Sequence, residues 1–493
     1  EGFLPGYNFP RLPLMAYIPG TPDGGGRKTY LQRPRFLALA EFGPRSLIYH
    51  EGRSYRVVRA LLALGQRDAA GGDVKLATET VRICRACGAG HFNEELSTCH
   101  GCRNSLDTAE IIHDVYRIEN VDTQPTERIT ADDEERQRQG FELQTTFRWA
   151  TRGGSPDVRH GGVFEGDDAV LNLSYGTSAE ITRINKGLRR RANRSKYGFM
   201  INPLSGMWAK NADEEGDADP TAVKSERIVP CVRDRKNALL VLPADPDLPP
   251  KTLTTLQHAL LRGIETECQL EPGEILAEPM PSRDDRKGLL LYEAAEGGAG
   301  VLNRLVSEPD LLPRIGRRAL SIMHFALEGE TVPSDPHDLR DVEGTSCVAA
   351  CYRCLMSYYN QPDHEDLDRR DAQAKQLLLR LARAATRLEE PASRAAEPSG
   401  PHTTGDTSGG GLLDAVARRD LPPPDAEPRV VDGYTIPAVW HEHYVAAVSA
   451  DVPESATGDL ADKGFLVVQF PADEADWPAP LDELARALGA RES

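Results

Sequence analysis

The sequence predicts an α+β protein of several domains, rich in strands and stabilised by metal ions. Three observations support this: two groups of closely spaced cysteines, short alternating apolar runs over the first 210 residues, and a shift to Pro, Gly, Ser and Thr after residue 388. A chain of 493 residues has room for two to four domains. We expect a β-rich N-terminal part with an inserted zinc ribbon, an α/β zinc-binding domain and a small α/β C-terminal tail.

Changes in pattern and composition give the borders of these parts. The expected parts are a β-rich region at 1–82, a zinc ribbon at 83–106, a β-rich region with a basic segment at 107–210, a zinc-binding α/β domain at 225–388, a flexible linker at 389–430 and a small tail at 431–493. The first residues, from Glu1 on, read like sequence from inside a protein, which indicates a fragment of a longer chain.

Composition and charge narrow the class of protein. No apolar run reaches the length of a bilayer span and no secretory leader opens the chain, so we expect a soluble protein with no membrane contact. Nine cysteines, seven of them in metal-type clusters, favour a reducing compartment, and we expect the cytoplasm. A net charge of −18 argues against uniform wrapping by nucleic acid but allows a local basic groove.

The first cysteine group has the spacing of a zinc ribbon. Cys84 and Cys87 form one C-x2-C knuckle, and Cys99 and Cys102 form a second one, which begins twelve positions after Cys87. Two such knuckles place four thiolates around one ion, and a closed four-thiolate shell leaves no position for water. We therefore expect a structural zinc ion here, holding an element too small to fold alone.

Apolar periodicity gives a coarse secondary structure. Strand patterns cover residues 111–116, 141–149, 163–164, 169–173, 180–185, 228–234, 237–242 and 288–292, and helical patterns cover about 130–136, 252–267, 311–327 and 366–388. In the tail, residues 464–470 read as a strand and 481–488 as a helix.

One run of cations stands out in this acidic chain. It comprises Lys186, Arg189, Arg190, Arg191, Arg194, Lys196 and Tyr197. Cations beside an aromatic ring suit DNA, because the charges neutralise phosphates and the ring stacks on bases. An ordinary charged surface loop explains the same pattern equally well.

The second cysteine group, Cys347, Cys351 and Cys354, has the spacing C-x3-C-x2-C of a metal knuckle. A tetrahedral zinc site needs a fourth ligand, and we expect His364, with Asp363, Cys231 and Cys268 as alternatives. Buried apolar cysteines are the alternative without a metal. A three-cysteine iron-sulfur cluster, as in radical enzymes, is a further alternative, although Arg353 stands where those enzymes usually carry an aromatic residue.

Motifs of a motor or a nuclease are missing from the sequence. The stretch 20–29 fails the phosphate-loop pattern because Arg27 replaces the required glycine, and the acidic run 132–134 follows a polar loop instead of a strand. We found no convincing carboxylate-lysine set for a nuclease and no catalytic residue. The glycines at 297–300 suit tight helix-strand packing better than anion binding.

Four segments together resemble the C-terminal zinc-binding domain of the Mrf type. They are residues 3–10, the Gly297–Gly300 motif, the run from Cys347 to Cys354, and residues 357–364, and the resemblance covers about residues 1–388. That domain ends many superfamily-two DNA helicases and occurs in subunits of the DISARM antiphage system. In the family four cysteines bind zinc; three are matched here, and His364 is the expected substitute for the fourth.

The resemblance implies an accessory module of a DNA helicase, with two zinc ions as cofactors and DNA and the helicase motor as partners. The motor would lie upstream or in a separate subunit, and defence-system subunits are further expected partners in antiphage defence or DNA repair. Two other hypotheses stay open at this point: a protein-protein scaffold that does not touch DNA, and a metal-dependent enzyme, either a nuclease or an iron-sulfur radical enzyme.

Overall fold

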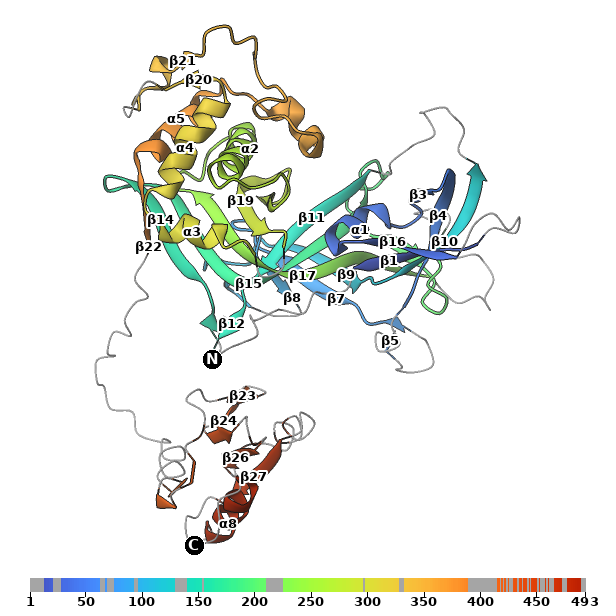
Figure 1. The fold of residues 1–493 in the computed structure, drawn as a ribbon. Helices are drawn as coiled ribbons and strands as arrows, with labels where there is room; N and C mark the ends of the chain where they lie inside the picture. The colour runs from blue at the N-terminus through green and yellow to red at the C-terminus, as the bar shows by residue number, and fades with distance from the viewer. Residues whose placement is uncertain are drawn as a thin grey trace. The chain divides into compact units, whose positions relative to one another are not determined.

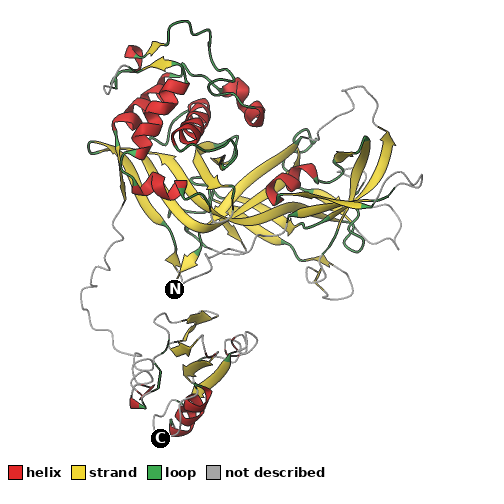
Figure 2. Ribbon diagram, viewed as in Figure 1, coloured by secondary structure: helices red, strands yellow, loops and turns green. Residues whose placement is uncertain are grey.

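Strands dominate the structure, as the alternating apolar runs predict. The computed structural model describes residues 13–20, 28–62, 67–68, 75–92, 96–128, 140–152, 155–209, 225–295, 298–327, 332–388 and shorter pieces between 415 and 488. The chain divides into two compact units, the first of residues 1–150 with 156–392 and the second of residues 151–155 with 393–493. Both units mix strands and helices, which confirms the α+β class (Figure 2).

An eleven-stranded sheet runs through the first unit, with the main order β22-β14-β15-β17-β9-β7-β8. β11 pairs with β15, β16 and β19 pair with β17, and β18 pairs with β19. The strands of this sheet are β7 (Glu79–Ile83), β8 (Gly90–Phe92), β9 (Glu110–Arg117), β11 (Phe141–Arg148), β14 (Arg159–Glu165), β15 (Asp168–Leu188), β16 (Phe199–Ile201), β17 (Glu226–Pro243), β18 (Ile275–Pro281), β19 (Arg286–Glu293) and β22 (Ala385–Leu388).

Two strands, β15 and β17, are much longer than the sequence suggested. β15 has 21 residues and β17 has 18, and they pair with each other from Leu171↔Pro243 to Ile184↔Cys231. The sequence analysis divided each into two shorter strands. A register shift between Gly176 and Ala179 in β15 breaks the apolar alternation there, and in β17 the charged residues 234–236 interrupt the apolar run. The sheet therefore crosses the expected borders near 107 and 225.

Helices cover one end of this sheet (Figure 1). They are α2 (Pro250–Glu267), α3 (Val301–Ser307), α4 (Leu311–Ile322) and α5 (Ala372–Arg383). Their apolar residues and those of the underlying strands form one buried core that includes Leu256, Leu291 and Ile315. α2 crosses α4 at Gly263, where an added Cβ would lie 2.9 Å from the carbonyl oxygen of Ile315. The helix patterns at 252–267, 311–327 and 366–388 correspond to α2, α4 and α5.

A largely irregular segment connects α4 to α5 and carries the second cysteine group. Its regular pieces are β20 (Phe325–Ala326), the 3-10 helix η2 (Pro336–Asp338), β21 (Arg340–Asp341) and the 3-10 helix η3 (Tyr358–Asp366). The thiol of Cys354 and the side chain of Leu355 are buried in the helical core, so this segment is packed onto the helices.

A separate five-stranded sheet, in the order β2-β1-β10-β4-β3, lies at the end of the first unit away from the helices α2, α4 and α5 (Figure 1). It contains β1 (Leu14–Ile18), β2 (Thr29–Arg33), β3 (Leu47–His50), β4 (Arg53–Ala60) and β10 (Val121–Arg128), with helix α1 (Arg35–Glu41) between β2 and β3. The small pairs β5 (Arg67–Asp68) with β6 (Lys75–Leu76) and β12 (Thr151–Arg152) with β13 (Ser155–Pro156) complete the strands before residue 157.

The second unit is a small α/β structure. It has the hairpin β23 (Arg429–Val431) with β24 (Tyr434–Ile436), the sheet β25 (Ala438–Trp440), β26 (Val445–Ser449) and β27 (Leu466–Phe470), and helix α8 (Pro478–Ala487). Trp440, Phe470 and Leu484 belong to its core, which agrees with the expected strand near 464–470 and helix near 481–488.

Some expectations fall outside the described residues. These are the motif at residues 3–10, the helix near 130–136, Gly297 and most of the linker at 389–430. The adjoining Gly298 has φ +69°, and an added Cβ would collide with the buried carboxylate of Glu293, which agrees with tight packing. No helix in the described part of the chain is long and apolar enough to cross a membrane.

Candidate metal centres

The four ribbon cysteines come together as the spacing predicts. Cys84 and Cys87 lie in the turn between β7 and β8, and Cys99 and Cys102 lie in the loop that follows β8. The Sγ atoms of Cys84 and Cys102 are 3.6 Å apart, as are those of Cys87 and Cys99. A tetrahedral zinc ion with Zn–S bonds of ~2.3 Å separates its sulfurs by about 3.8 Å, whereas a disulfide needs ~2.05 Å. The four thiols therefore suit one shared ion.

The ribbon is packed into a larger core of the first unit. β7 pairs with β9, and the four cysteines pack with Phe147 of β11, with Trp149 just after β11 and with Tyr292 of β19. Within the knuckle, the backbone N–H of Gly101 donates to Cys99 Sγ at 3.3 Å. Metal at this site thus stabilises one edge of the large sheet as well as the ribbon itself.

The second group is formed by His324, Cys347, Cys351 and Cys354. Their ligand atoms all lie within 4.8 Å of one another, with Cys347 Sγ 3.8 Å and Cys351 Sγ 3.6 Å from Cys354 Sγ. The Nε2 atom of His324 lies 3.3 Å from Cys351 Sγ. Three thiolates and one imidazole at these separations are a structural zinc set, because no coordination position is left for water.

Local hydrogen bonds favour the thiolate form of one of these cysteines. Burial raises the pKa of Cys351, but hydrogen bonds from His324 and from the backbone of Arg353 outweigh burial and lower it to about 6. Because zinc binds the thiolate, this lowering prepares Cys351 for the metal at neutral pH.

We therefore correct the fourth candidate ligand from His364 to His324. The Nε2 atom of His364 lies 3.1 Å from the carbonyl oxygen of Ser357 and 3.0 Å from Asn360 Oδ1, so this ring serves the packing of η3. His324 lies 23 residues before Cys347, just after α4, where no local spacing marks it as a ligand. The distant alternatives Cys231, in β17, and Cys268, at the end of α2, are not members of the group either.

Asp363, the remaining alternative, belongs to a buried polar cluster instead. Its carboxylate accepts from Arg286 Nη2 at 2.8 Å and lies 2.9 Å from His258 Nε2, and Arg283 lies 2.8 Å away. Arg286 also donates to Gln257 Oε1 at 2.8 Å. The cluster thus fastens η3 to α2 and β19.

Replacing Asp363 by Asn should destabilise the first unit at neutral pH and reduce the loss of stability on acidification. Burial raises the pKa of Asp363, but the hydrogen bond with His258 and the charges of Arg286 and Arg283 outweigh it and lower the pKa. A carboxylate with a lowered folded pKa stabilises the fold fully above about pH 4 and loses this contribution as pH falls through the folded pKa.

Urea midpoints measured from pH 7 down to the acid limit test this. Asp366→Asn is the matched control, because Asp366 is half-exposed and its ion pair, 3.5 Å long, is with the exposed Lys251. Acid also releases zinc from both variants, so the difference between them reports Asp363 alone. Equal midpoints for the two variants at pH 7 would contradict the role given to Asp363.

Comparison with known proteins agrees with this geometry. Residues 256–355 match the sequence-family model of the MrfA zinc-binding domain. The matched range includes His324 and the three cysteines and ends before His364. The chain contains an MrfA-type zinc-binding domain. Together with the ribbon cysteines, this gives the chain two zinc sites.

The other two comparisons add little. The crystal structure of the DUF1998 helicase MrfA bound to DNA is similar over 76% of this chain and 34% of that chain, at 10% identity and a TM-score of 0.33. The chain thus covers about a third of the length of that helicase. No curated protein matches the sequence.

A buried arginine holds the backbone of the MrfA-type zinc site. Arg369 is fully buried and donates to the carbonyl oxygens of Met323 at 2.6 Å, Cys347 at 3.1 Å and His324 at 3.3 Å. Its guanidinium also pairs with Asp341 and lies over the ring of Phe325. Arg369 therefore positions His324 and Cys347, two candidate ligands that are far apart in the sequence. Nothing in the sequence except its position after the cysteines pointed to this role.

The basic segment divides into a buried part and an exposed part. Lys186 is buried, and its Nζ donates to Glu110 Oε1 at 2.6 Å and to Gln144 Oε1 at 3.0 Å. Tyr197 donates to the same Glu110 oxygen at 2.8 Å. Arg191 donates to Glu142 Oε2 at 2.6 Å. Lys186, Arg191 and Tyr197 thus have acidic partners within the chain, so their contact with DNA stays a prediction and the exposed cations are the better candidates.

The pKa of Lys186 agrees with its role as a buried ion-pair partner of Glu110. Burial lowers the pKa of Lys186, but the hydrogen bond and charge of Glu110 outweigh it and the net shift is upward. The remaining cations of the segment are exposed, and they are Arg189, Arg190, Arg194 and Lys196. Arg189 and Arg194 line a surface hollow of ≈ 210 Å³ that also includes Glu142 and Asp284.

Proposed function

We propose that this chain is an accessory, zinc-stabilised module of a superfamily-two DNA helicase, which engages DNA or the helicase motor. The observation that supports it is the coincidence of the MrfA zinc-binding domain match with the His324 and cysteine group. Zinc with four protein donors holds the module in shape and takes no part in chemistry. A setting in antiphage defence, as in DISARM, or in DNA repair belongs to the proposal through the sequence resemblance.

The proposed duplex-binding surface is the exposed part of the basic segment, at the end of β15. Arg189, Arg190 and Arg194 are exposed and follow one another within six positions. Because phosphate contacts depend on local cations, a short exposed cluster can bind DNA even on a chain with a net charge of −18.

Reversing these three charges together, Arg189→Glu with Arg190→Glu and Arg194→Glu, should weaken duplex binding at least tenfold. Each phosphate contact contributes about 0.9 to the slope of log K against log salt, so the slope should fall by about three. Fluorescence anisotropy with a labelled duplex over a range of salt concentrations measures both quantities.

The control is a second triple variant that changes the net charge by the same amount outside the basic segment. It combines Lys251→Glu, Lys287→Glu and Arg370→Glu, and these three side chains are exposed. If both triple variants bind duplex as the unmodified chain does, the basic segment is not the contact. If the unmodified chain binds no DNA of any form, the DNA half of the proposed function fails.

A protein-docking scaffold is the second candidate, and one feature favours it. Four large apolar or aromatic side chains are exposed close to the MrfA-type zinc site: Val348, Tyr352, Tyr358 and Tyr359, the last one 82% exposed. Exposed tyrosines of this kind are typical of protein interfaces. Loss of motor binding in Tyr352→Ser with Tyr359→Ser, with DNA binding unchanged, would favour the scaffold.

We do not extend the proposal to a metal-dependent enzyme. Radical enzymes need three cysteines and an open iron position, but here His324 stands as a fourth donor beside the three cysteines. The ribbon likewise has four thiols around one point. Neither donor set leaves the open position that metal-assisted hydrolysis requires.

A further inference from the structure

The five-stranded sheet has one covered face and one open face. Side chains that point to the covered face, among them Ala16, Ile48 and Val57, are buried and pack with Leu39 of α1. Alternation along each strand sends the intervening residues to the opposite face. That opposite face carries large exposed aromatic side chains.

Tyrosines and arginine share the open face. Tyr17 pairs with Tyr30 across β1 and β2, and their ring centroids are 5.3 Å apart. On the far strands Leu47 pairs with Arg56, and Tyr49 follows Leu47 by two positions and so points the same way. Tyr30 is 58% exposed and Tyr49 is 38% exposed.

The strand register shows that the side chains of Tyr17 and Tyr30, at one end of the sheet, and those of Tyr49 and Arg56, at the other end, lie on the same face. Tyr17 pairs with Asp122 of β10, and Gln124, two positions further along β10, pairs with Arg56 of β4. From β2 to β3 there are four interstrand steps of ~4.8 Å, so the tyrosines span about 19 Å. We call the surface formed by Tyr17, Tyr30, Tyr49 and Arg56 the tyrosine face.

Residues 28–62, which include three of the four residues of the tyrosine face, are basic, whereas the chain as a whole is acidic. Residues 28–62 contain seven Lys or Arg and two Asp or Glu, whereas the whole chain has a net charge of −18. Arg45 and Arg56 form no ion pair with a carboxylate among the described residues. The backbone N–H of Arg45 donates to the carbonyl oxygen of Val57 at 3.1 Å, so Arg45 lies beside the part of β4 that carries Arg56. Burial, together with the charge of Arg56, lowers the pKa of Arg45, as expected for two neighbouring cations.

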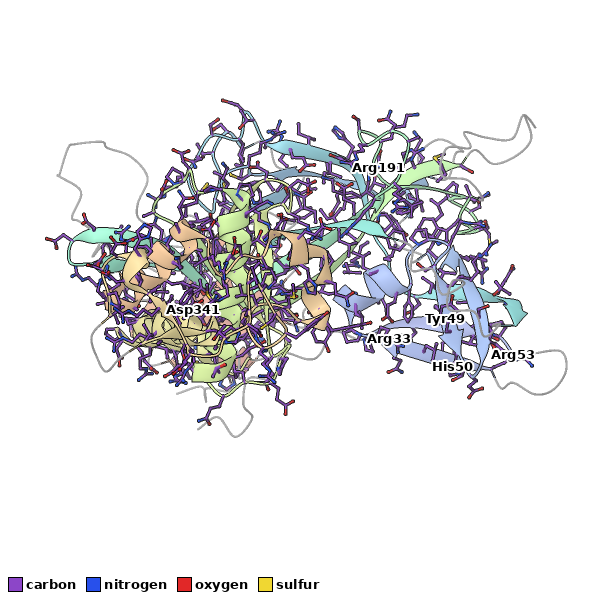
Figure 3. All side chains as sticks on the ribbon, turned by 90° about the horizontal axis from the view of Figure 1, so that it is seen from above. Arg33, Tyr49, His50, Arg53, Arg191 and Asp341 are labelled. Atoms are coloured by element: carbon purple, nitrogen blue, oxygen red, sulfur yellow. The ribbon has the colours of Figure 1, made fainter. Side chains whose placement is uncertain are left out.

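We propose that the tyrosine face binds single-stranded DNA, with bases stacked on Tyr30 and Tyr49 and with Arg56 and Arg45 at the phosphates. Rings on an open sheet need unstacked bases, which a single strand offers and a duplex does not. This inference rests on the proposed function, to which it adds a second DNA contact and the form of DNA bound there. Figure 3 shows Tyr49 on the small sheet and Arg191, of the basic segment, apart from it.

The test uses the full chain and a labelled oligothymidylate of about 16 nucleotides, the upper end of site sizes for single-strand-binding folds. Tyr30→Ala with Tyr49→Ala should weaken binding by roughly tenfold or more, since stacking of bases on aromatic rings is a main source of affinity for single strands. Tyr30→Phe with Tyr49→Phe keeps both rings and should retain the affinity. Tyr352→Ala with Tyr359→Ala removes two exposed tyrosines elsewhere and should leave it unchanged.

A fluorescence measurement separates contact from loss of structure. All four native tryptophans, Trp149, Trp208, Trp440 and Trp477, are buried and emit at shorter wavelength than an exposed indole, so the emission that Tyr30→Trp adds is read at long wavelength, as the difference from the unmodified chain. The oligothymidylate should quench this added emission as it binds, which a merely structural role would not produce.

The outcomes distinguish this inference from the proposed function. Unaltered single-strand affinity in the alanine variant, or unquenched emission at position 30 during binding, would overturn the inference. If the unmodified chain binds duplex through the basic segment but no single strand, this inference fails and the proposed function stands. If it binds neither form, both fail.

Discussion

Replacing Arg369 by Met should lower the free energy of unfolding of the first unit by about 3 kcal/mol or more, because each buried carbonyl group left without its donor costs roughly 1–3 kcal/mol. Met fills a similar volume but donates no hydrogen bond. The carbonyl oxygens of Met323, His324 and Cys347 would then be buried without their donor. Because two of these residues bear zinc ligands, zinc affinity should also fall about 10–100-fold.

Urea unfolding and competition with a chromogenic zinc chelator measure the two effects. Asp341→Asn is the matched control: it removes the carboxylate partner of Arg369, but the Asp341 side chain is 46% exposed. Exposed ion pairs contribute about 0–1 kcal/mol, so this variant should stay near the unmodified chain. Equal effects of the two substitutions would show that the ion pair, and not the carbonyl contacts, gives Arg369 its role.

Replacing Cys354 by Ser should remove one zinc ion and unfold the MrfA-type domain. Cys354 is fully buried, and its Sγ accepts from the backbone N–H of Cys351 at 3.1 Å. Structural zinc contributes about 10–16 kcal/mol of apparent binding free energy, as much as the whole stability of a typical domain. Limited proteolysis should then cut within residues 256–355, while the second unit keeps its own core.

The matched control is Cys268→Ser, because Cys268 lies at the end of α2 outside both donor groups. That variant should keep two zinc ions and resist the protease. A Cys354→Ser variant that resists proteolysis as well as Cys268→Ser does would mean that packing alone holds the domain.

Local sequence spacing predicted the ribbon completely and the second group only in part. Cys84, Cys87, Cys99 and Cys102 lie in two short motifs, so spacing alone identifies them. His324 reaches its group through the tertiary packing of α4, and a distance of 23 residues has no local signature. His364 looked suitable because it is close in sequence, but its position in η3 turns its ring to Ser357 and Asn360.

The composition of the basic segment did not show which of its cations are buried. Lys186 lies in β15 where the pairing with β11 shifts register, between Glu142↔Gly187 and Leu143↔Asn185. Residues 184–187 are all buried there, so no apolar alternation in the sequence marks the burial of Lys186. Its partners Glu110 and Gln144 come from other strands, so the network itself was not predictable from the segment.

The division of β15 and β17 into shorter strands has a similar cause. Each of β15 and β17 continues through a point where apolar alternation breaks, at the register shift in β15 and at the charged residues 234–236 of β17. A break in a pattern resembles a boundary, although pairing between two long strands can carry the sheet across it.

Elemental analysis of the purified chain tests the central claim most directly. The account predicts two zinc ions and no iron per chain, with one zinc left in Cys354→Ser and one left in Cys87→Ser. Iron in the unmodified chain, or a zinc content that neither substitution lowers, would contradict it.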